Sequence, residues 1–343
     1  MLFRSAIDNM ILEKDIYRNI SNNKECEFNN NQYDIITAPV DSNIIVISGA
    51  GTGKTTTMIN RLIYLRKVMK EFSFEEAVLI TFTNKASIEM KERLLEVLDR
   101  YFKVTNDPTY LDLMEEAARC SISTIHKFSK KLLNKYGKHI GINKDIQVRS
   151  FKYKRQEAIN EALNNIYKEN RELYDLIKYY PIYEVEKKML NVWEILDNYS
   201  IDLNSNKYKV NFDEKNGGFS ELISRVLKTA QSILDEEKVN KLEIADLMKK
   251  LSYNDLFNGI KKDYKVIMVD EFQDSDNIQI EFITELCKRI DANILVVGDE
   301  KQSIYRFRGA EHTAFDKLKE FLKDSKKQLK EYEKFIYILS IWV

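Results

Sequence analysis

The sequence predicts an α/β fold in which a parallel β-sheet is covered by helices and is interrupted by an inserted helical subdomain. Four short apolar runs are rich in β-branched residues and do not alternate with polar residues, as is typical of strands buried on both faces of a parallel sheet. They are Ile44–Ile47, Ala77–Thr81, Val266–Val269 and Ile294–Val297. A polar motif follows each run and helical patterns come after the motifs, which favours alternating strands and helices.

Apolar side chains that recur with the helical period of 3.6 residues mark the helices. The first such stripe is Leu94, Val97, Leu98 and Tyr101. Two more lie between about residues 130 and 240: Ile159, Ala162, Leu163 and Ile166, and then Phe219, Leu222, Ile223, Val226, Ala230, Ile233 and Leu234. The polar stretch 204–218 between them is a predicted loop, and Trp193 is a predicted core residue. Because strands resume afterwards, an insertion is preferred over a separate, unrelated domain.

Composition limits the function classes. Lys plus Arg equals Asp plus Glu, at 54 each, so a nucleic-acid partner cannot be argued from global charge and needs a local surface. The three cysteines are far apart and form no Cys-x-x-Cys pair, which leaves a zinc or iron–sulfur site unsupported. The first twenty residues do not resemble a signal peptide, and no apolar run is long enough to cross a membrane. We therefore expect a cytoplasmic protein with no membrane partner.

A glycine-rich loop directly follows the first predicted strand and precedes a helical pattern. The predicted nucleotide contacts in it are Gly49, Ala50, Gly51, Thr52, Gly53, Lys54, Thr55 and Thr56. Glycines let backbone N–H groups surround phosphate oxygens, Lys54 can reach the β- and γ-phosphates, and Thr55 can bind Mg²⁺. Ser48 stands where the usual pattern has glycine or alanine. The alternative, a glycine-rich turn before a helix, is disfavoured by this context.

An acidic pair, Asp270-Glu271, follows the predicted strand Val266–Val269. Asp270 can hold the magnesium ion, directly or through water, and Glu271 can orient and deprotonate the attacking water. The alternative is that the two acids cap the next helix. Because the phosphate loop is present, we favour the catalytic role.

A third block, residues 298–310, follows the last predicted strand. Gln302 is a neutral hydrogen-bonding group that can respond to the γ-phosphate. Tyr305 and Phe307 alternate with Arg306 and Arg308, a pattern that can stack on bases and hold backbone phosphates. Taken alone, such a cluster is more often an ordinary packed loop.

Taken together, these blocks resemble motifs I, II and III of superfamily 1A helicases, the UvrD/Rep/PcrA group with its RecB- and AddA-like relatives. The resemblance covers about residues 32–314, and further blocks match in order. It implies that Gln32 contacts the adenine, and that Gln279 completes an extended motif II. It implies single-stranded DNA contacts for two groups of residues, which are Phe82, Thr83 and Asn84, and Thr124 and His126, and it supports the same role for Tyr305, Phe307 and Arg308. The segment 244–247 resembles the short acidic motif ahead of motif II.

The resemblance also implies a domain plan. It comprises an N-terminal extension (1–20), a first RecA-like P-loop NTPase domain in two parts (21–129 and 241–322), an inserted helical accessory subdomain (130–240) and a degenerate tail (323–343) where a second motor domain is expected. Residues 329–334 lack the asparagine and arginine of the family's next block. We therefore expect a truncated motor, or one that takes its second half from a separate chain.

The implied function is ATP-dependent 3′-to-5′ DNA helicase activity, in which hydrolysis of ATP with Mg²⁺ drives translocation on single-stranded or 3′-tailed duplex DNA, for example in DNA repair. One alternative is a catalytically weak half-motor that only binds ATP and DNA. A small-metabolite kinase is another, and the blocks around Phe272-Gln273-Asp274 and Gln302 argue against it.

Overall fold

The computed structural model describes residues 28–49, 51–137, 146–198, 201, 203, 217–238, 241–253, 263–302, 314–323 and 329–333. The chain divides into two compact units, which are each considered separately. The first, called the sheet unit, comprises 1–132, 254–275 and 279–343, and the second, called the helical unit, comprises 133–253 and 276–278. The domain boundaries expected from the sequence stay predictions.

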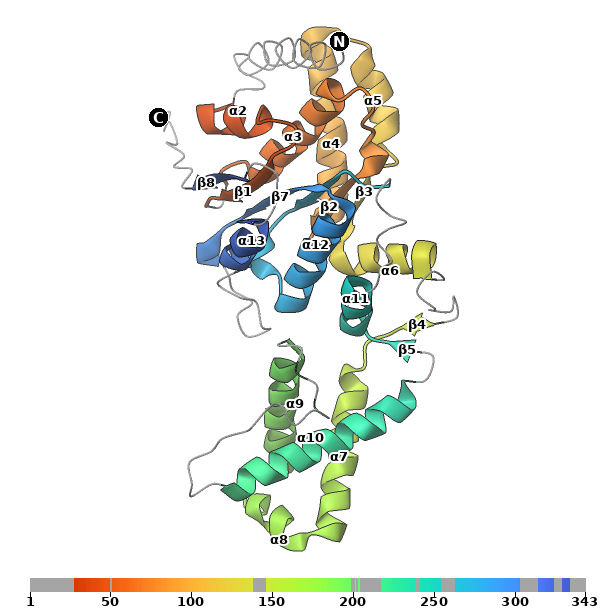
Figure 1. Cartoon of the computed structure of the whole chain (residues 1–343), viewed down its shortest axis with the longest axis vertical. Coiled ribbons are helices and arrows are strands. Elements are labelled where there is room, and N and C mark those ends of the chain that lie inside the picture. The colour runs from red at the N-terminus through yellow and green to blue at the C-terminus, as the bar shows by residue number, and fades with distance from the viewer. Residues whose placement is uncertain are drawn as a thin grey trace. The chain divides into compact units, whose positions relative to one another are not determined.

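The sheet unit is built on a six-stranded sheet with the order β3-β2-β6-β7-β1-β8 (Figure 1). Every pair of neighbouring strands is parallel, which confirms the predicted fold class. The strands are β1 (Asn43–Ile47), β2 (Ala77–Thr81), β3 (Ser121–Thr124), β6 (Val266–Val269), β7 (Asn293–Gly298) and β8 (Leu329–Glu333). The four predicted strands thus form the centre of the sheet.

The two edge strands were not predicted. β8 lies in the stretch assigned to the tail at 323–343, yet it pairs in parallel with β1, with Ile45 opposite Glu331. The expected degenerate tail thus contributes a strand to this sheet, and its assignment as the start of a second motor domain stays a prediction. An edge strand has a neighbour on one side only and tolerates polar and charged residues, so β8 and the Ser/Thr-rich β3 lack the apolar run that marks a central strand.

Helices cover both faces of this sheet, with α3 and α4 on one face and α12 and α13 on the other (Figure 1). The helices of the sheet unit are α2 (Asn30–Ile36), α3 (Lys54–Val68), η1 (Phe74–Glu76), α4 (Asn84–Thr105), α5 (Thr109–Ala117), α6 (Ile125–Tyr136), η6 (Phe272–Asp274), α12 (Asn277–Ile290), η7 (Glu300–Gln302) and α13 (Ala314–Lys323). The predicted stripe on α4, from Leu94 to Tyr101, is buried in the core with α3 and α5.

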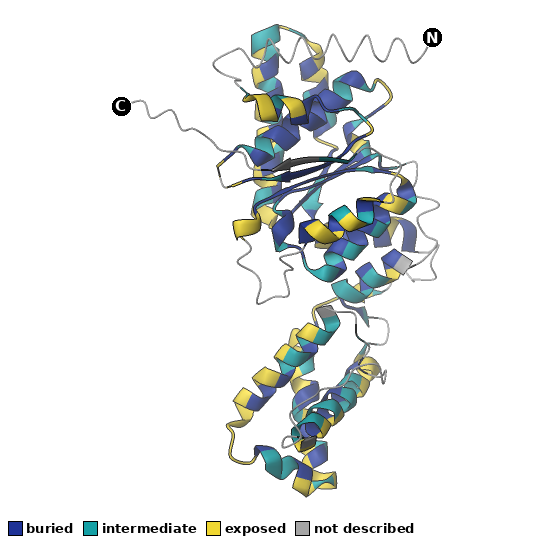
Figure 2. Cartoon of the chain, turned by 60° about the vertical axis from the view of Figure 1, so that its left-hand side comes forward, coloured by how far each residue is buried: buried dark blue, intermediate teal, exposed yellow. Residues whose placement is uncertain are grey.

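The helical unit has its own apolar core, visible as the buried faces of its helices in Figure 2. Its elements are β4 (Gln147–Val148), α7 (Lys152–Glu169), α8 (Arg171–Tyr174), η3 (Asp175–Ile177), α9 (Ile182–Asn198), α10 (Gly217–Glu237), β5 (Lys241–Leu242) and α11 (Ile244–Tyr253). The predicted stripes on α7 and α10 line this core, and Trp193 is 0% exposed within it, as expected. α10 begins at Gly217, so the predicted loop ends there, and residues 204–216 lie outside the described part of the chain.

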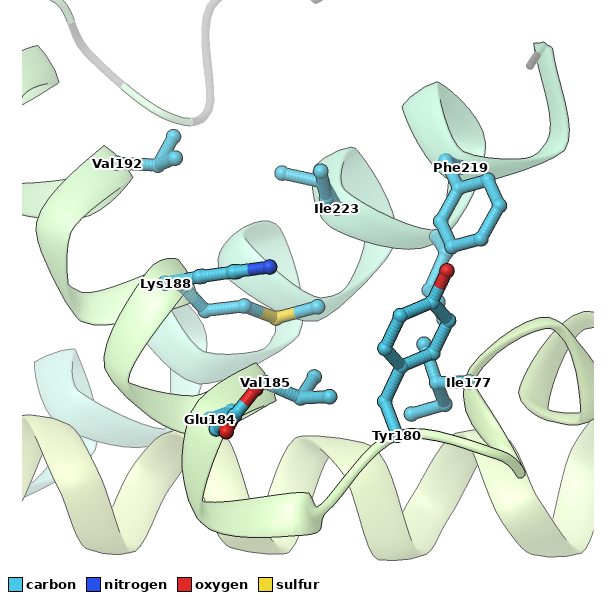
Figure 3. Close-up of a pocket in the computed structure, with 10 residues that line it drawn as sticks. Ile177, Tyr180, Glu184, Val185, Lys188, Val192, Phe219 and Ile223 are labelled. Carbon is cyan, nitrogen blue, oxygen red and sulfur yellow. The ribbon is translucent and has the colours of Figure 1, made fainter.

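A mostly apolar cavity of about 210 Å³ lies between helices of the helical unit (Figure 3). Val185 and Val192 of α9 and Ile223 of α10 supply part of its wall, and Lys188 also lines it. None of the residues predicted to bind ATP or DNA lines it. In the described part of the chain, no helix is both long and apolar enough to span a membrane.

Candidate nucleotide-binding site

The candidate site lies where β1, β7 and β6 end, side by side in the sheet. The glycine-rich loop follows β1, the acidic pair follows β6, and the block beginning at Gly298 follows β7. Ser48 N donates to Gly298 O at 2.9 Å, so the start of the loop is bonded to the end of the central strand of the three. In parallel sheets this carboxyl edge is where ligands bind.

The glycine-rich loop turns sharply into α3. Gly51 and Gly53 have φ angles of 71° and 77°, a left-handed conformation that side chains with a Cβ rarely adopt. Gly53 is the N-cap of α3, whose first residue is Lys54, so the unpaired N–H groups of the helix start face the loop. Such a helix start attracts phosphate through its N–H groups and its dipole.

Side chains inside the loop fix its shape. Thr52 Oγ1 donates to Gly49 O at 2.9 Å and lies 3.0 Å from Ser48 Oγ. Ser48, the departure from the usual pattern, is buried and supplies this second contact. Lys54 Nζ donates to the carbonyls of Ser48 and Gly49, each at 3.1 Å, which holds the ammonium group against the loop.

Thr55 meets the acidic motif directly. Thr55 Oγ1 donates to Asp270 Oδ2 at 2.8 Å across 215 positions of sequence. Burial raises the pKa of Asp270, the nearby Glu271 charge adds to the rise, and the hydrogen bond from Thr55 opposes it. A hydroxyl and a carboxylate are hard oxygen ligands, which suit Mg²⁺ when waters and phosphate oxygens complete its shell. The oxygens of Thr55 and Asp270 therefore fit a magnesium ion whose remaining ligands come from outside the protein.

Glu271 adopts an unusual backbone conformation. Its φ is 51°, which costs a residue with a side chain about 1 kcal/mol. Two hydrogen bonds act on it: Glu271 N donates to Asp270 Oδ1 at 3.0 Å, and Gln273 Nε2 donates to Glu271 Oε2 at 2.8 Å. The carboxylate predicted to act on water is therefore oriented by its neighbours.

Gln32 lies against the phosphate loop. Its side chain forms a capping box with Asn29 at the start of α2, and Nε2 donates to Thr52 O at 3.1 Å. The buried Arg61 of α3 holds the other end of α2, since it donates to the carbonyls of Ile36 and Pro39 at 3.0 and 2.7 Å. The structure thus brings Gln32 to the site, and its contact with adenine stays a prediction.

Two groups of residues expected to contact DNA lie at or just after the ends of β2 and β3, which are neighbours at the far end of the same edge. Thr83 is the N-cap of α4, with Oγ1 accepting from Ala86 N at 3.1 Å. Thr124 ends β3 and is buried. His126 lies in the first turn of α6 and is exposed. DNA contact by these residues, and by Phe82 and Asn84, stays a prediction.

The third block is only partly described. Gln302 ends η7 with its side chain exposed, and its N–H donates to Asp299 O at 3.0 Å. Ala50, Tyr305, Phe307 and Arg308 lie outside the described residues.

Two buried polar residues at the site were not among the predicted site residues. Gln273 is 3% exposed and Asp299 is 6% exposed. Gln273 Oε1 accepts from Asp299 N at 2.9 Å, while Asp299 Oδ1 accepts from Lys301 N at 3.0 Å. Gln273 and Asp299 each come within a few residues of the end of a predicted buried strand. That position in the sequence is the signal from which they could have been predicted.

A phosphate-type loop after β1, an acidic pair after β6 and a wholly parallel sheet define a P-loop NTPase domain. Within that class, the family model for the UvrD/REP helicase N-terminal domain matches residues 28–323, and the chain belongs to this family.

Curated helicases are similar to most of the chain. A probable DNA helicase II homolog of Mycoplasma capricolum is 30% identical over 280 residues, covering 79% of this chain and 34% of the relative. The ATP-dependent DNA helicase Rep of Buchnera aphidicola is 29% identical over 277 residues, covering 80% and 36%. The ATP-dependent DNA helicase PcrA of Bacillus subtilis is 29% identical over 281 residues, covering 80% and 33%. The chain thus spans about a third of the length of each of these relatives.

Proposed function

We propose that the chain is the ATP-binding motor domain of a DNA helicase that hydrolyses Mg-ATP to move 3′-to-5′ along single-stranded DNA. The observation that carries the proposal is the 2.8 Å contact between Thr55 and Asp270, because it joins the phosphate loop to the acidic motif at one point. Thr55 and Asp270 would hold a magnesium ion there, and the ion would supply positive charge for the phosphates of ATP.

Each residue then has a defined task. Lys54 leaves the carbonyls of Ser48 and Gly49 to neutralise phosphate charge, while Thr55 and Asp270 hold Mg²⁺. Glu271 orients and deprotonates the attacking water. Gln32, next to Thr52, contacts the adenine. The DNA strand follows the loops after β2 and β3, on the side of the edge away from β1.

The second candidate is a half-motor that binds ATP and DNA but hydrolyses ATP only with a partner chain. The described residues that form the site include Lys54, Asp270 and Glu271 but no arginine, and phosphoryl transfer in P-loop NTPases commonly needs one. This candidate predicts the same ATP binding and no stimulation of hydrolysis by DNA.

Phosphate release by the 343-residue chain, with and without an oligonucleotide, separates the two candidates. A motor domain is stimulated by single-stranded DNA, however low its rate, and Glu271→Gln abolishes the stimulated rate. Mg-ATP binding without detectable hydrolysis, either with or without the oligonucleotide, would argue for the half-motor.

The binding step is tested separately by Lys54→Ala. Loss of the ammonium group next to the phosphates should weaken Mg-ATP binding by at least about tenfold, the effect of one charge-assisted hydrogen bond. Isothermal titration calorimetry measures this change. Lys103→Ala removes an exposed lysine of α4, paired with Asp99 at 2.6 Å, and is the matched control that should keep wild-type affinity. Equal ATP affinity for Lys54→Ala and wild type would contradict the proposal that the loop around Lys54 binds the phosphates of ATP.

A further inference from the structure

Gln273 connects two segments of the site through one buried amide group. Its Nε2 donates to Glu271 Oε2 at 2.8 Å, and its Oε1 accepts from the backbone N–H of Asp299 at 2.9 Å. Because a backbone N–H can only donate, the amide must present its oxygen to Asp299. Its NH₂ group is thereby directed at Glu271.

The space for this amide depends on Gly298. A Cβ at position 298 would lie 2.2 Å from Gln273 Oε1 and 2.9 Å from Phe315 Cζ. Cβ atoms in proteins do not approach other atoms this closely, so a side chain at position 298 would force Gln273 and Phe315 to shift. The ring of Phe315 packs on Phe272 at 5.4 Å between centroids, which closes the other side. Shape and hydrogen bonds therefore hold the amide in one orientation.

The end of β7 is also joined to the phosphate loop. Gly298 O accepts from Ser48 N at 2.9 Å, and Asp299 Oδ2 lies 4.0 Å from the position a Cβ would take at Gly49. One short path thus runs from the loop through the end of β7 and Gln273 to Glu271.

We propose that Gln273 is a positioning residue that sets the carboxylate of Glu271 relative to the end of β7, so that the geometry of water activation depends on that segment. The inference rests on the proposed function of Glu271. A shift of the β7 end when nucleotide enters the loop is transmitted to Glu271 through a single amide. If Gln273 only anchored Asp299, its NH₂ group would have no bearing on hydrolysis.

Two substitutions separate these roles. Gln273→Glu keeps an oxygen for the Asp299 N–H and, at a pH where its carboxyl is ionised, presents a negative charge to Glu271 in place of the donor, whereas Gln273→Met removes both hydrogen bonds. In both variants we expect the rate of single-turnover ATP hydrolysis to fall about tenfold to a hundredfold, the effect of one charge-assisted hydrogen bond. Mg-ATP affinity by calorimetry should stay within about twofold of wild type, a change of less than half a kcal/mol. A loss of rate without a loss of affinity is the signature of positioning.

The hydrogen bond from Asp299 N–H to Gln273 can be tested without an activity measurement. NMR measures the rate of hydrogen exchange of this backbone amide. Protection should persist in Gln273→Glu and be lost in Gln273→Met. The matched control is Gln156→Glu in the helical unit, where Gln156 Nε2 donates to Glu186 Oε2 at 3.3 Å. This control should leave rate, affinity and Asp299 exchange unchanged.

Gly298→Ala tests the positioning of Gln273 independently, by placing a methyl group against its side chain. It should lower the rate as Gln273→Met does, and its effect should shrink in a Gln273→Ala background, where the colliding oxygen is absent. A wild-type rate in Gln273→Glu, or a loss of affinity equal to the loss of rate, would overturn the positioning role. A wild-type rate in Glu271→Gln would instead overturn the proposed function, while Asp299 exchange still tests the bridge.

Discussion

Asp274 ends η6 with a carboxylate whose Oδ1 is buried and, among the described residues, has no hydrogen-bond partner. Burial, together with the charge of Glu271, raises the pKa of Asp274 from 3.8 to about 6. The folded chain therefore holds this proton more tightly than the unfolded chain, and the free energy of unfolding falls as pH rises from about 4 to about 6. Above about pH 6, the ionised Asp274 lowers the free energy of unfolding by an amount that no longer changes with pH.

Replacing Asp274 by Asn should remove this pH dependence. At pH 7 the variant should be more stable than wild type by about 1 kcal/mol, after allowance for solvent screening of a partly exposed group. At pH 4 the two should be equally stable, because Asp274 is then largely protonated in the folded chain. Urea unfolding at both pH values measures the difference. A constant stability gap at the two pH values would contradict the prediction.

At the scale of elements, the loop between β2 and α4 is one described part of the predicted DNA track. Phe82 precedes Thr83, the N-cap that starts α4. Stacking of a base on an aromatic ring typically contributes ~1–3 kcal/mol, so Phe82→Leu, which keeps apolar bulk, should weaken binding of a labelled oligonucleotide about tenfold or more. Fluorescence anisotropy at two salt concentrations provides the measurement.

The control for this loss is an aromatic residue of the helical unit, Tyr153, which is 72% exposed. Tyr153→Leu removes a ring of similar size from a different surface, so it should leave oligonucleotide affinity unchanged. If Phe82→Leu also binds like wild type, the loop after β2 does not stack on DNA.

β8 is an element whose removal has a defined consequence. It pairs with β1 over the whole of Asn43–Ile47, the strand that leads into the phosphate loop. A chain ending at residue 328 should lose stability by a few kcal/mol, lower its Tm and self-associate, because β1 then becomes an unprotected edge of apolar residues. A chain ending at residue 333 keeps β8 and is the control. Thermal unfolding and light scattering compare them, and equal Tm values would show that β8 does not protect the edge.

Short sequence patterns predicted the central strands of the sheet and the main residues of the candidate site. The loop around Lys54 and the acids Asp270 and Glu271 could be predicted because each motif is a continuous segment next to a buried strand. The edge strands could not, since their residues lack an apolar run. The hydrogen bond between Gln273 and Asp299 could not be predicted from a short sequence pattern either, because it joins residues 26 positions apart that meet only after folding.

At the scale of the whole molecule, the proposed function gives the sheet unit one face of an ATP site. Thr55 follows Lys54 and donates to Asp270, whose carboxylate accepts from the backbone N–H of Glu271. In the motor mechanism proposed here, arginines of a second motor domain approach the phosphates from the opposite side. Absence of a comparable arginine typically lowers the rate ~10³–10⁵-fold, which corresponds to about 4–7 kcal/mol of barrier.

We therefore expect the 343-residue polypeptide, studied alone, to bind Mg-ATP, to hydrolyse it at a trace rate and to leave duplex DNA intact. In the proposed mechanism, translocation requires two motor domains that close on the strand between them, and the described residues form one parallel sheet of this kind. A strand-displacement assay on a 3′-tailed duplex measures this, with the same duplex carrying a 5′ tail as the polarity control. Unwinding of the 3′-tailed duplex that appears only when a separately expressed second motor domain is added would support the split-motor form of the proposal. Robust ATP-dependent unwinding by the polypeptide alone would show that the opposite face of the site is dispensable, and the proposed mechanism would then be wrong.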